Sequence, residues 1–133
     1  MYPILYEILE LFYQKVRADI LIGYHFYKFE NKEVLDPHLK RITLFWEMQL
    51  TTKCSYELEG PPFRLLFTHL QLPIKKGEVN RWVIIFKQNF EEFEKAYLQK
   101  YPNIEAKQFM EVLKENWYLK ILFFENKFLA QFK

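Results

Sequence analysis

Apolar residues recur along most of this chain every three or four positions, which is the spacing of one face of an α-helix. The pattern predicts a helix over residues 4–20, which Gly23 ends, a long helix over 76–100, which Pro102 stops, and a last helix over 103–130. The core-facing positions expected in these three helices are Leu5, Ile8, Leu9, Phe12 and Val16; Val79, Trp82, Val83, Phe86, Phe90, Phe93 and Tyr97; and Phe109, Val112, Leu113, Trp117, Ile121, Phe124 and Phe128.

Between the first two of these helices, the helical spacing of apolar residues is interrupted more often. Residues 24–35 are expected to form a loop with a short turn or two. A helix is predicted over 37–51, because Asp36 can cap it and Pro37 suits its first turn. Its inner face would carry His38, Ile42, Phe45, Trp46 and Gln49, with His38 in the first turn, where fraying could let the side chain swing out.

Gly60-Pro61-Pro62 is the strongest loop signal in the chain. It precedes a predicted short helix over 63–70, which cannot extend past Pro73. With no internal repeat or linker, the 133 residues are expected to form a single all-α domain, residues 1–133.

The composition points to a binding site for something flat and apolar. The chain has 14 Phe, 9 Tyr and 3 Trp, which is more ring surface than an ordinary core of this size requires. An aromatic-rich core without any ligand would give the same composition, so both interpretations stay open at this point.

Charge and apolar runs exclude several partners. Net charge is only +2 and the basic residues alternate with acidic ones, so we expect no nucleic-acid partner. The apolar runs are too short to cross a bilayer and no secretory leader opens the chain, so we expect no membrane association and a cytoplasmic location. A single cysteine, Cys54, excludes an internal disulfide.

The histidines give the best chemical candidate. None of His25, His38 and His69 has companions at the spacing of a zinc site, and there is no G-x-S-x-G nucleophile motif. Haem iron needs only one imidazole ligand while packing holds the macrocycle, and His69 lies among leucines just before Pro73. A lone histidine on an apolar helix is more commonly a structural residue, so this placement alone leaves both possibilities open.

Three blocks of the chain carry a resemblance to a known family. They are "LFYQKVRAD" followed by "IGYHF", "HLKRITLFW", and "HLQLPIKKGEVNRWVIIF". Their order and internal spacing resemble those of a bacterial group III (P-type) truncated haemoglobin over most of residues 4–100. The resemblance implies a truncated globin fold, a two-over-two helical sandwich around haem b (iron protoporphyrin IX).

The resemblance also implies a role for each matched residue. His69 would be the axial iron ligand, Tyr13 and Trp82 the distal hydrogen-bond donors, and His38 the distal residue that gates access. Phe26 would pack on the haem ring. The remaining haem contacts would be Phe12, Ile42, Phe45 and Trp46 along the distal and inner walls, and Arg41 at a propionate.

The function implied is binding of dioxygen, nitric oxide, carbon monoxide or other small ligands, including oxygen transport, with nitric oxide dioxygenase or peroxidase-like activity and an electron-donating reductase as partner. The chain would be a monomer or weak dimer. Its last helix is bulkier than the family's usual one, which would narrow the pocket or face a partner subunit. The alternative is a haem-free globin-fold interaction or sensory module, in which His69 has no ligand and the rings only form a core.

Overall fold

The computed structural model describes residues 1–57 and 74–131, and within these ranges every regular element is a helix. The elements are α1 (Tyr2–Ala18), the 3-10 helix η1 (Gly23–Glu30), α2 (Lys32–Thr51), α4 (Lys76–Lys100) and α5 (Ile104–Gln131). The all-α class is therefore confirmed. The short helix predicted over 63–70 lies outside the described residues.

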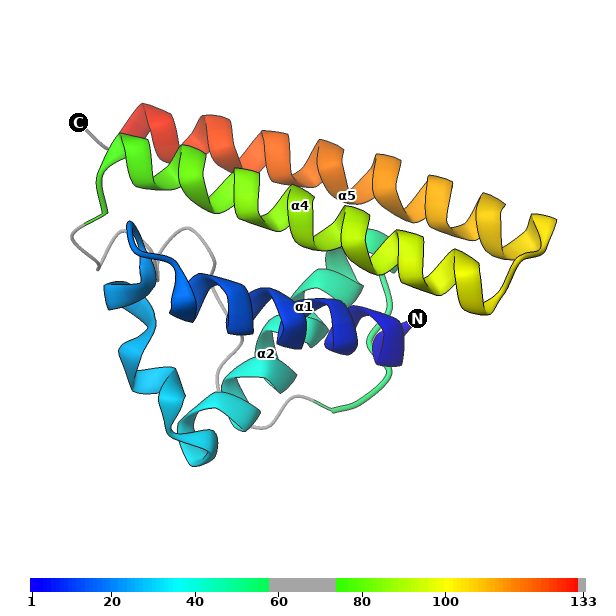
Figure 1. Ribbon diagram of the computed structural model, residues 1–133, viewed down its shortest axis with the longest axis horizontal. Helices are drawn as coiled ribbons and strands as arrows, with labels where there is room; N and C mark the ends of the chain where they lie inside the picture. The colour runs from blue at the N-terminus through cyan, green and yellow to red at the C-terminus, as the bar shows by residue number, and fades with distance from the viewer. Residues whose placement is uncertain (58–73, 132–133) are drawn as a thin grey trace.

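The four long helices form two pairs (Figure 1). α4 and α5 run antiparallel beside each other, whereas α1 and α2 cross. α1 packs on α2 and on α4, and α5 packs on α4 and on α2, so the two pairs face each other across one core. This arrangement places the middle of α1 against both α2 and α4, which is where the candidate site lies.

The starts of α1 and α4 follow from their first turns. Pro3 stands at the beginning of α1, where its missing N–H removes no helix hydrogen bond. At α4 the carboxylate of Glu78 accepts the backbone N–H of Lys75 at 2.9 Å, one half of a capping box. α1, α4 and α5 agree with the predicted helices to within about two residues.

The predicted start of the middle helix is wrong. α2 begins at Lys32, because the side chain of Asn31 caps it by accepting the backbone N–H of Glu33 at 2.9 Å. Pro37 therefore lies inside the helix, and His38 is in the second turn rather than in a fraying first turn. The preceding stretch, expected to be a loop, is mostly the 3-10 helix η1.

A close approach fixes the turn from α1 to η1. The side chain of Asp19 accepts the backbone N–H groups of Leu21 and Ile22 at 3.0 and 3.1 Å. A Cβ on Gly23 would lie 2.7 Å from the backbone oxygen of Arg17, so only glycine fits without a shift of the backbone.

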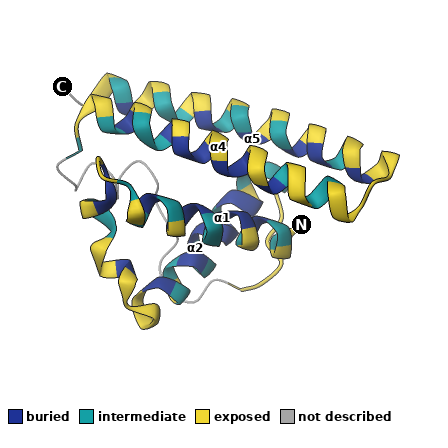
Figure 2. Ribbon diagram, viewed as in Figure 1, coloured by how far each residue is buried: buried dark blue, intermediate teal, exposed yellow. Residues whose placement is uncertain are grey.

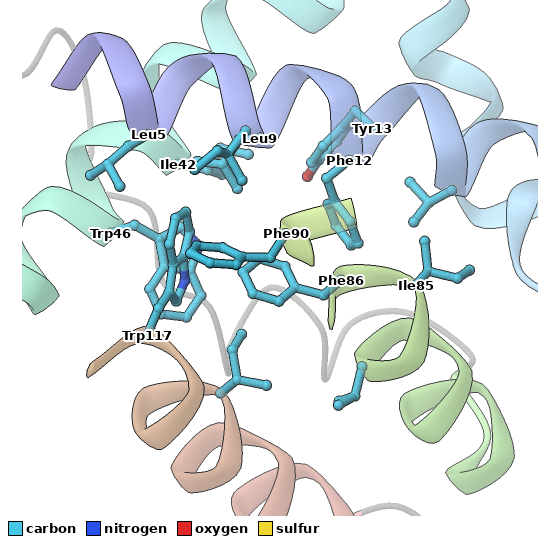
Figure 3. Packing of buried hydrophobic residues seen from close by; sticks show 14 of the residues in the cluster. Leu5, Leu9, Phe12, Tyr13, Ile42, Trp46, Ile85, Phe86, Phe90 and Trp117 are labelled. Carbon is cyan, nitrogen blue, oxygen red and sulfur yellow. The ribbon is translucent and has the colours of Figure 1, made fainter. Parts of the chain in front are cut away.

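A group of contacting rings lies within the core between the two pairs (Figure 3). Trp117 of α5 is fully buried, and its ring centroid lies 5.1 Å from that of Phe86 and 5.7 Å from that of Trp46. Phe90 completes this group at 6.1 Å from Trp117. Burial of each such side chain stabilises the fold by roughly 1.5–3 kcal/mol, so this group is a large part of the hydrophobic stabilisation. One predicted core position is wrong, since Val112 is 58% exposed.

The C-terminal end of α2 is fastened by a buried carboxylate. Glu47 is 3% exposed and accepts the backbone N–H and the hydroxyl of Ser55, each at 2.6 Å. Between them Thr52 ends the helix in the left-handed region at φ 61°, with its N–H bonded to the backbone oxygen of Met48. The chain that follows α2 thus leaves from a fixed point.

Candidate functional site

A buried phenol and an imidazole meet where α1 crosses α2. The hydroxyl of Tyr13, on α1, lies 2.7 Å from Nε2 of His38, on α2, which is a hydrogen bond. Tyr13 is only 8% exposed, and its burial raises the pKa of the phenol far above the ordinary value. The Tyr13 hydroxyl therefore keeps its proton at neutral pH and remains able to donate it in a hydrogen bond.

Rings from η1 enclose this pair. Phe29 stacks on the imidazole of His38 with ring centroids 4.5 Å apart, and its ring lies 5.4 Å from that of Tyr13. Phe26 meets Tyr13 edge-on at 5.7 Å. The sequence analysis found Phe26 but missed Phe29. The spacing of three between these phenylalanines was a signal for one face of a helix, hidden because the stretch was expected to be a loop.

A second set of rings connects α1 to α4 beside the pair. Phe12, adjacent to Tyr13 in the chain, lies 5.2 Å from Trp82 and 5.5 Å from Phe86, measured between ring centroids. Trp82 and Phe86 are stacked at 5.7 Å. Trp82 is half-buried, and its indole N–H makes no hydrogen bond within the described part of the chain. The structure thus brings Phe12, Tyr13, Phe26, His38 and Trp82 into one neighbourhood.

The other predicted site residues lie further along α2. Ile42 is buried one turn after His38. Phe45 and Trp46 pack against Phe124 of α5, with ring centroids 5.9 and 5.7 Å away, so both contribute to the α2–α5 core. Core packing is therefore part of their role.

Arg41 is half-buried, and His69 lies outside the described residues. Arg41 borders a cavity of about 390 Å³ between the start of α1 and the first half of α2, lined by Tyr2, Tyr6, Asp36, Pro37, Lys40, Arg41 and Leu44. Arg41 lies on α2, three residues after His38.

A polar cluster joins η1 to the start of α4, one helical turn before Trp82, and none of its residues was among the predicted site residues. Nε2 of His25 lies 3.0 Å from the carboxylate of Glu78, which also accepts the hydroxyl of Tyr24. Burial acts to raise the pKa of Glu78, but the hydrogen bonds from Tyr24, from the backbone N–H of Lys75 and from His25 outweigh it, so this pKa is lowered. Trp82 is one helical turn beyond Glu78, so η1 fixes the end of α4 that carries it.

An ion pair supports the same corner. Arg81 donates two hydrogen bonds to one carboxylate oxygen of Asp19, the shorter from a terminal nitrogen at 2.6 Å. These bonds from Arg81, together with the backbone N–H groups of Ile22 and Leu21, lower the pKa of Asp19. The α1–η1 turn and the start of α4 are thereby joined directly.

The chemistry that this neighbourhood offers is hydrogen-bond donation among apolar rings. The described residues contain no group of three or more His, Cys, Asp or Glu side chains that could hold a bare metal ion. They also contain no helix with the length and apolar character needed to cross a membrane. The donors are a phenol, an imidazole and an indole, surrounded by phenylalanines.

The chain was compared with models of known protein families, with curated proteins and with solved structures. None of the three comparisons found a match. The interpretation of the site therefore rests on its own residues and on the sequence blocks that contain them.

Proposed function

We propose that this protein is a haem protein that binds dioxygen and other diatomic ligands, and that His69 would hold the iron. The observation that carries the proposal is the part-buried Tyr13–His38 hydrogen bond, which lies among rings where α1 crosses α2. A single domain spanning 1–133, with the crossed pair α1–α2 over the antiparallel pair α4–α5, is compatible with a two-over-two truncated globin sandwich.

The residues present suit a haem. When bound, the group would supply an iron atom able to bind a diatomic ligand. His69 would hold the iron, Phe26, Phe12 and Ile42 would pack on the macrocycle, and Arg41 would pair with a propionate. The donors needed on the ligand side are the Tyr13 hydroxyl and the Trp82 indole N–H, both within one group of contacting rings.

Tyr13 would stabilise a ligand whose outer atom carries partial negative charge. A hydrogen bond to a charged acceptor is roughly twice as strong as a neutral one. His38 determines whether the phenol proton is available. If Nε2 of His38 carries its own proton, it donates to the Tyr13 oxygen, and the Tyr13 O–H is then left to the ligand.

The same donors would stabilise negative charge that develops on a substrate beside them, which is the basis for nitric oxide dioxygenase or peroxidase-like activity. Such turnover would need an electron-donating reductase as partner. Nitric oxide consumption by the oxygenated protein, with nitrate quantified, tests this activity separately from binding.

The primary test is haem uptake. Purified protein is titrated with hemin, reduced and exposed to carbon monoxide, and we expect a sharp Soret band that the gas shifts. His69→Gly should abolish this spectrum and added imidazole should restore it, because free imidazole can replace the missing ligand. His25→Gly is the matched control and should keep it, since His25 is bonded to Glu78.

A wild-type protein that takes up no haem would overturn the proposal in favour of a haem-free globin-fold interaction or sensory module. Loss of haem in both histidine variants would indicate a folding defect instead, which circular dichroism of each apoprotein detects.

The donor role of Tyr13 is tested by kinetics. Tyr13→Phe should raise the dioxygen dissociation rate by about tenfold or more, because a hydrogen bond to a charged group contributes about 1.5–3 kcal/mol. Trp82→Phe is the comparison. A larger effect for Trp82→Phe would make the indole the main donor, and an unchanged rate in Tyr13→Phe would remove the phenol from this role.

A further inference from the structure

The ring of Phe29 covers one face of the His38 imidazole. The two rings lie 20° from parallel, with their centroids 4.5 Å apart. Gly23 and Phe29 are the buried residues of η1, whereas the rest of that helix is half-buried or exposed (Figure 2). The Phe29 ring also meets that of Tyr13 edge-on at 5.4 Å. Phe29 is thus the buried side chain through which η1 contacts both members of the Tyr13–His38 pair.

The backbone of Phe29 is tied to both helices that carry the pair. Nη1 of Arg17, on α1, donates to the backbone oxygen of Phe29 at 2.8 Å, and Nε of the same guanidinium donates to the backbone oxygen of Tyr13 at 3.2 Å. Two residues after Phe29, the side chain of Asn31 caps α2. The Phe29 ring therefore has little freedom to leave the imidazole while these bonds hold.

The stacked ring and the hydrogen bond restrict different motions of His38. Its side chain is only half-buried, and side chains that reach solvent commonly exchange between rotamers within nanoseconds. A quarter-turn about the Cβ–Cγ bond would drive the imidazole edge into Phe29, because the two rings are already in contact. A half-turn keeps the ring plane but puts a carbon atom where Nε2 was, which breaks the hydrogen bond to Tyr13. Each contact therefore blocks a rotation that the other permits.

We propose that Phe29 is the positioning residue that keeps His38 bonded to Tyr13. Without the Phe29 ring, the imidazole rotates and the Tyr13 hydroxyl loses its partner. The consequence for ligands rests on the proposed function, in which His38 would gate access to the ligand side. Phe29 then sets how often this gate opens, so removal of its ring speeds the entry of a diatomic ligand.

Hydrogen exchange of the Tyr13 hydroxyl tests the positioning in the full chain without hemin. Its proton resonance is assigned by its absence in Tyr13→Phe. We expect slow exchange in the wild type and exchange about tenfold faster in Phe29→Leu, which keeps an apolar side chain but has no ring to stack. Phe93→Leu is the matched control, because Phe93 is 7% exposed on α4 and stacks on Tyr97 instead. It should stay within about threefold of the wild type.

A second comparison separates positioning from a general loss of stability. His38→Leu should speed the exchange about tenfold in the wild type, but by less than about threefold in the Phe29→Leu background, where the bond is already lost. Phe29→Tyr keeps the ring and should keep the slow exchange. Exchange in Phe29→Leu that is no faster than in Phe93→Leu overturns the proposal, and so does a full effect of His38→Leu in the Phe29→Leu background.

Flash photolysis of the carbon monoxide complex tests the consequence for ligands. In hemin-loaded protein, Phe29→Leu should raise the association rate of carbon monoxide by about threefold or more, because His38 spends more time away from Tyr13. An unchanged association rate beside faster hydroxyl exchange overturns the effect of Phe29 on ligand entry. A chain that takes up no hemin overturns the proposed function alone, since the hydroxyl exchange is measured without hemin.

Discussion

Helices α1 and α5 are attached to the rest of the molecule in different ways. α1 is joined to each neighbour by polar links: Tyr13 to His38 in α2, Arg17 to the backbone oxygen of Phe29 in η1, and, in α4, the side chain of Asn89 to the backbone oxygen of Ile8 and to Lys15, which also pairs with Glu92. α5 is held on its buried side by the packing of Trp117 against rings, and Nε1 of Trp117 has no hydrogen-bond partner among the described residues. Its polar links to α4 are those of Lys114 to Glu91 and Glu94 and of the Tyr118 hydroxyl to the backbone oxygen of Lys87. Hydrogen bonds of α1 therefore reach into the core beside its packed apolar side, whereas the polar links of α5 lie at half-buried or exposed side chains.

The largest effect should come from the ring core. Trp117→Ala is expected to lower the free energy of unfolding by about 3–5 kcal/mol, because it removes a large buried side chain and leaves a cavity. Urea unfolding followed by circular dichroism measures this loss. Phe123→Ala, at a position of the same helix that is 53% exposed, should change it by less than about 0.5 kcal/mol. Equal losses would mean that α5 is not held by its inner rings.

A smaller effect is expected for the link between α1 and α4. Asn89 is fully buried, donates from Nδ2 to the backbone oxygen of Ile8 at 2.9 Å and accepts from Lys15 at 3.1 Å. Asn89→Leu keeps most of the volume but removes these bonds, so we expect a loss of about 1–3 kcal/mol in the same unfolding measurement. Gln88→Leu, next to it and exposed, is the control. A neutral result at Asn89 would show that packing alone positions α1.

The Tyr13–His38 bond should contribute less to stability than to chemistry. A double-mutant cycle with Tyr13→Phe and His38→Leu is expected to give a coupling energy of about 0.5–1.5 kcal/mol, as for an ordinary hydrogen bond within a protein. Additive losses of stability, with no coupling, would argue that the two side chains do not share a bond in solution.

The smallest effect should be the pH dependence of the Asp19–Arg81 pair. Because Arg81 and two backbone N–H groups lower the pKa of Asp19 in the folded state, ionised Asp19 stabilises the fold above its ordinary pKa. That contribution is lost as the pH falls through the lowered folded pKa. Asp19→Asn should therefore lower the urea midpoint at pH 7, and the difference from wild type should shrink from about pH 5 downward. A constant difference would exclude this ionisation as its cause.

The sequence predicts the parts of this fold that rest on repeated spacing. α4 and α5 are long and strongly apolar on one side, so their bounds could be read closely. The start of α2 could not be predicted in this way. Asp36-Pro37 has the sequence of a helix start, but the side chain of Asn31 caps the helix five residues earlier. Val112 was misassigned because α5 carries two apolar stripes, and spacing alone does not say which faces the core.

The part of the candidate site that could be predicted consists of residues that are close together in the sequence and lie on one helix. Phe12 and Tyr13 are adjacent, and their helix carries both toward Trp82 and His38. The bonds from Glu78 to His25 and from Asp19 to Arg81 join residues more than fifty positions apart. Such pairs depend on how η1 turns, and no local pattern encodes that direction. The role of His69 stays a prediction.

The fastening at the end of α2 has a consequence for evolution and for engineering of this chain. The bonds between Glu47 and Ser55, with Thr52 between them, fix the carboxyl end of α2, as the side chain of Asn31 fixes its start. A change in chain length beyond Ser55 would therefore displace His38 on α2 only after breaking the bonds to Glu47.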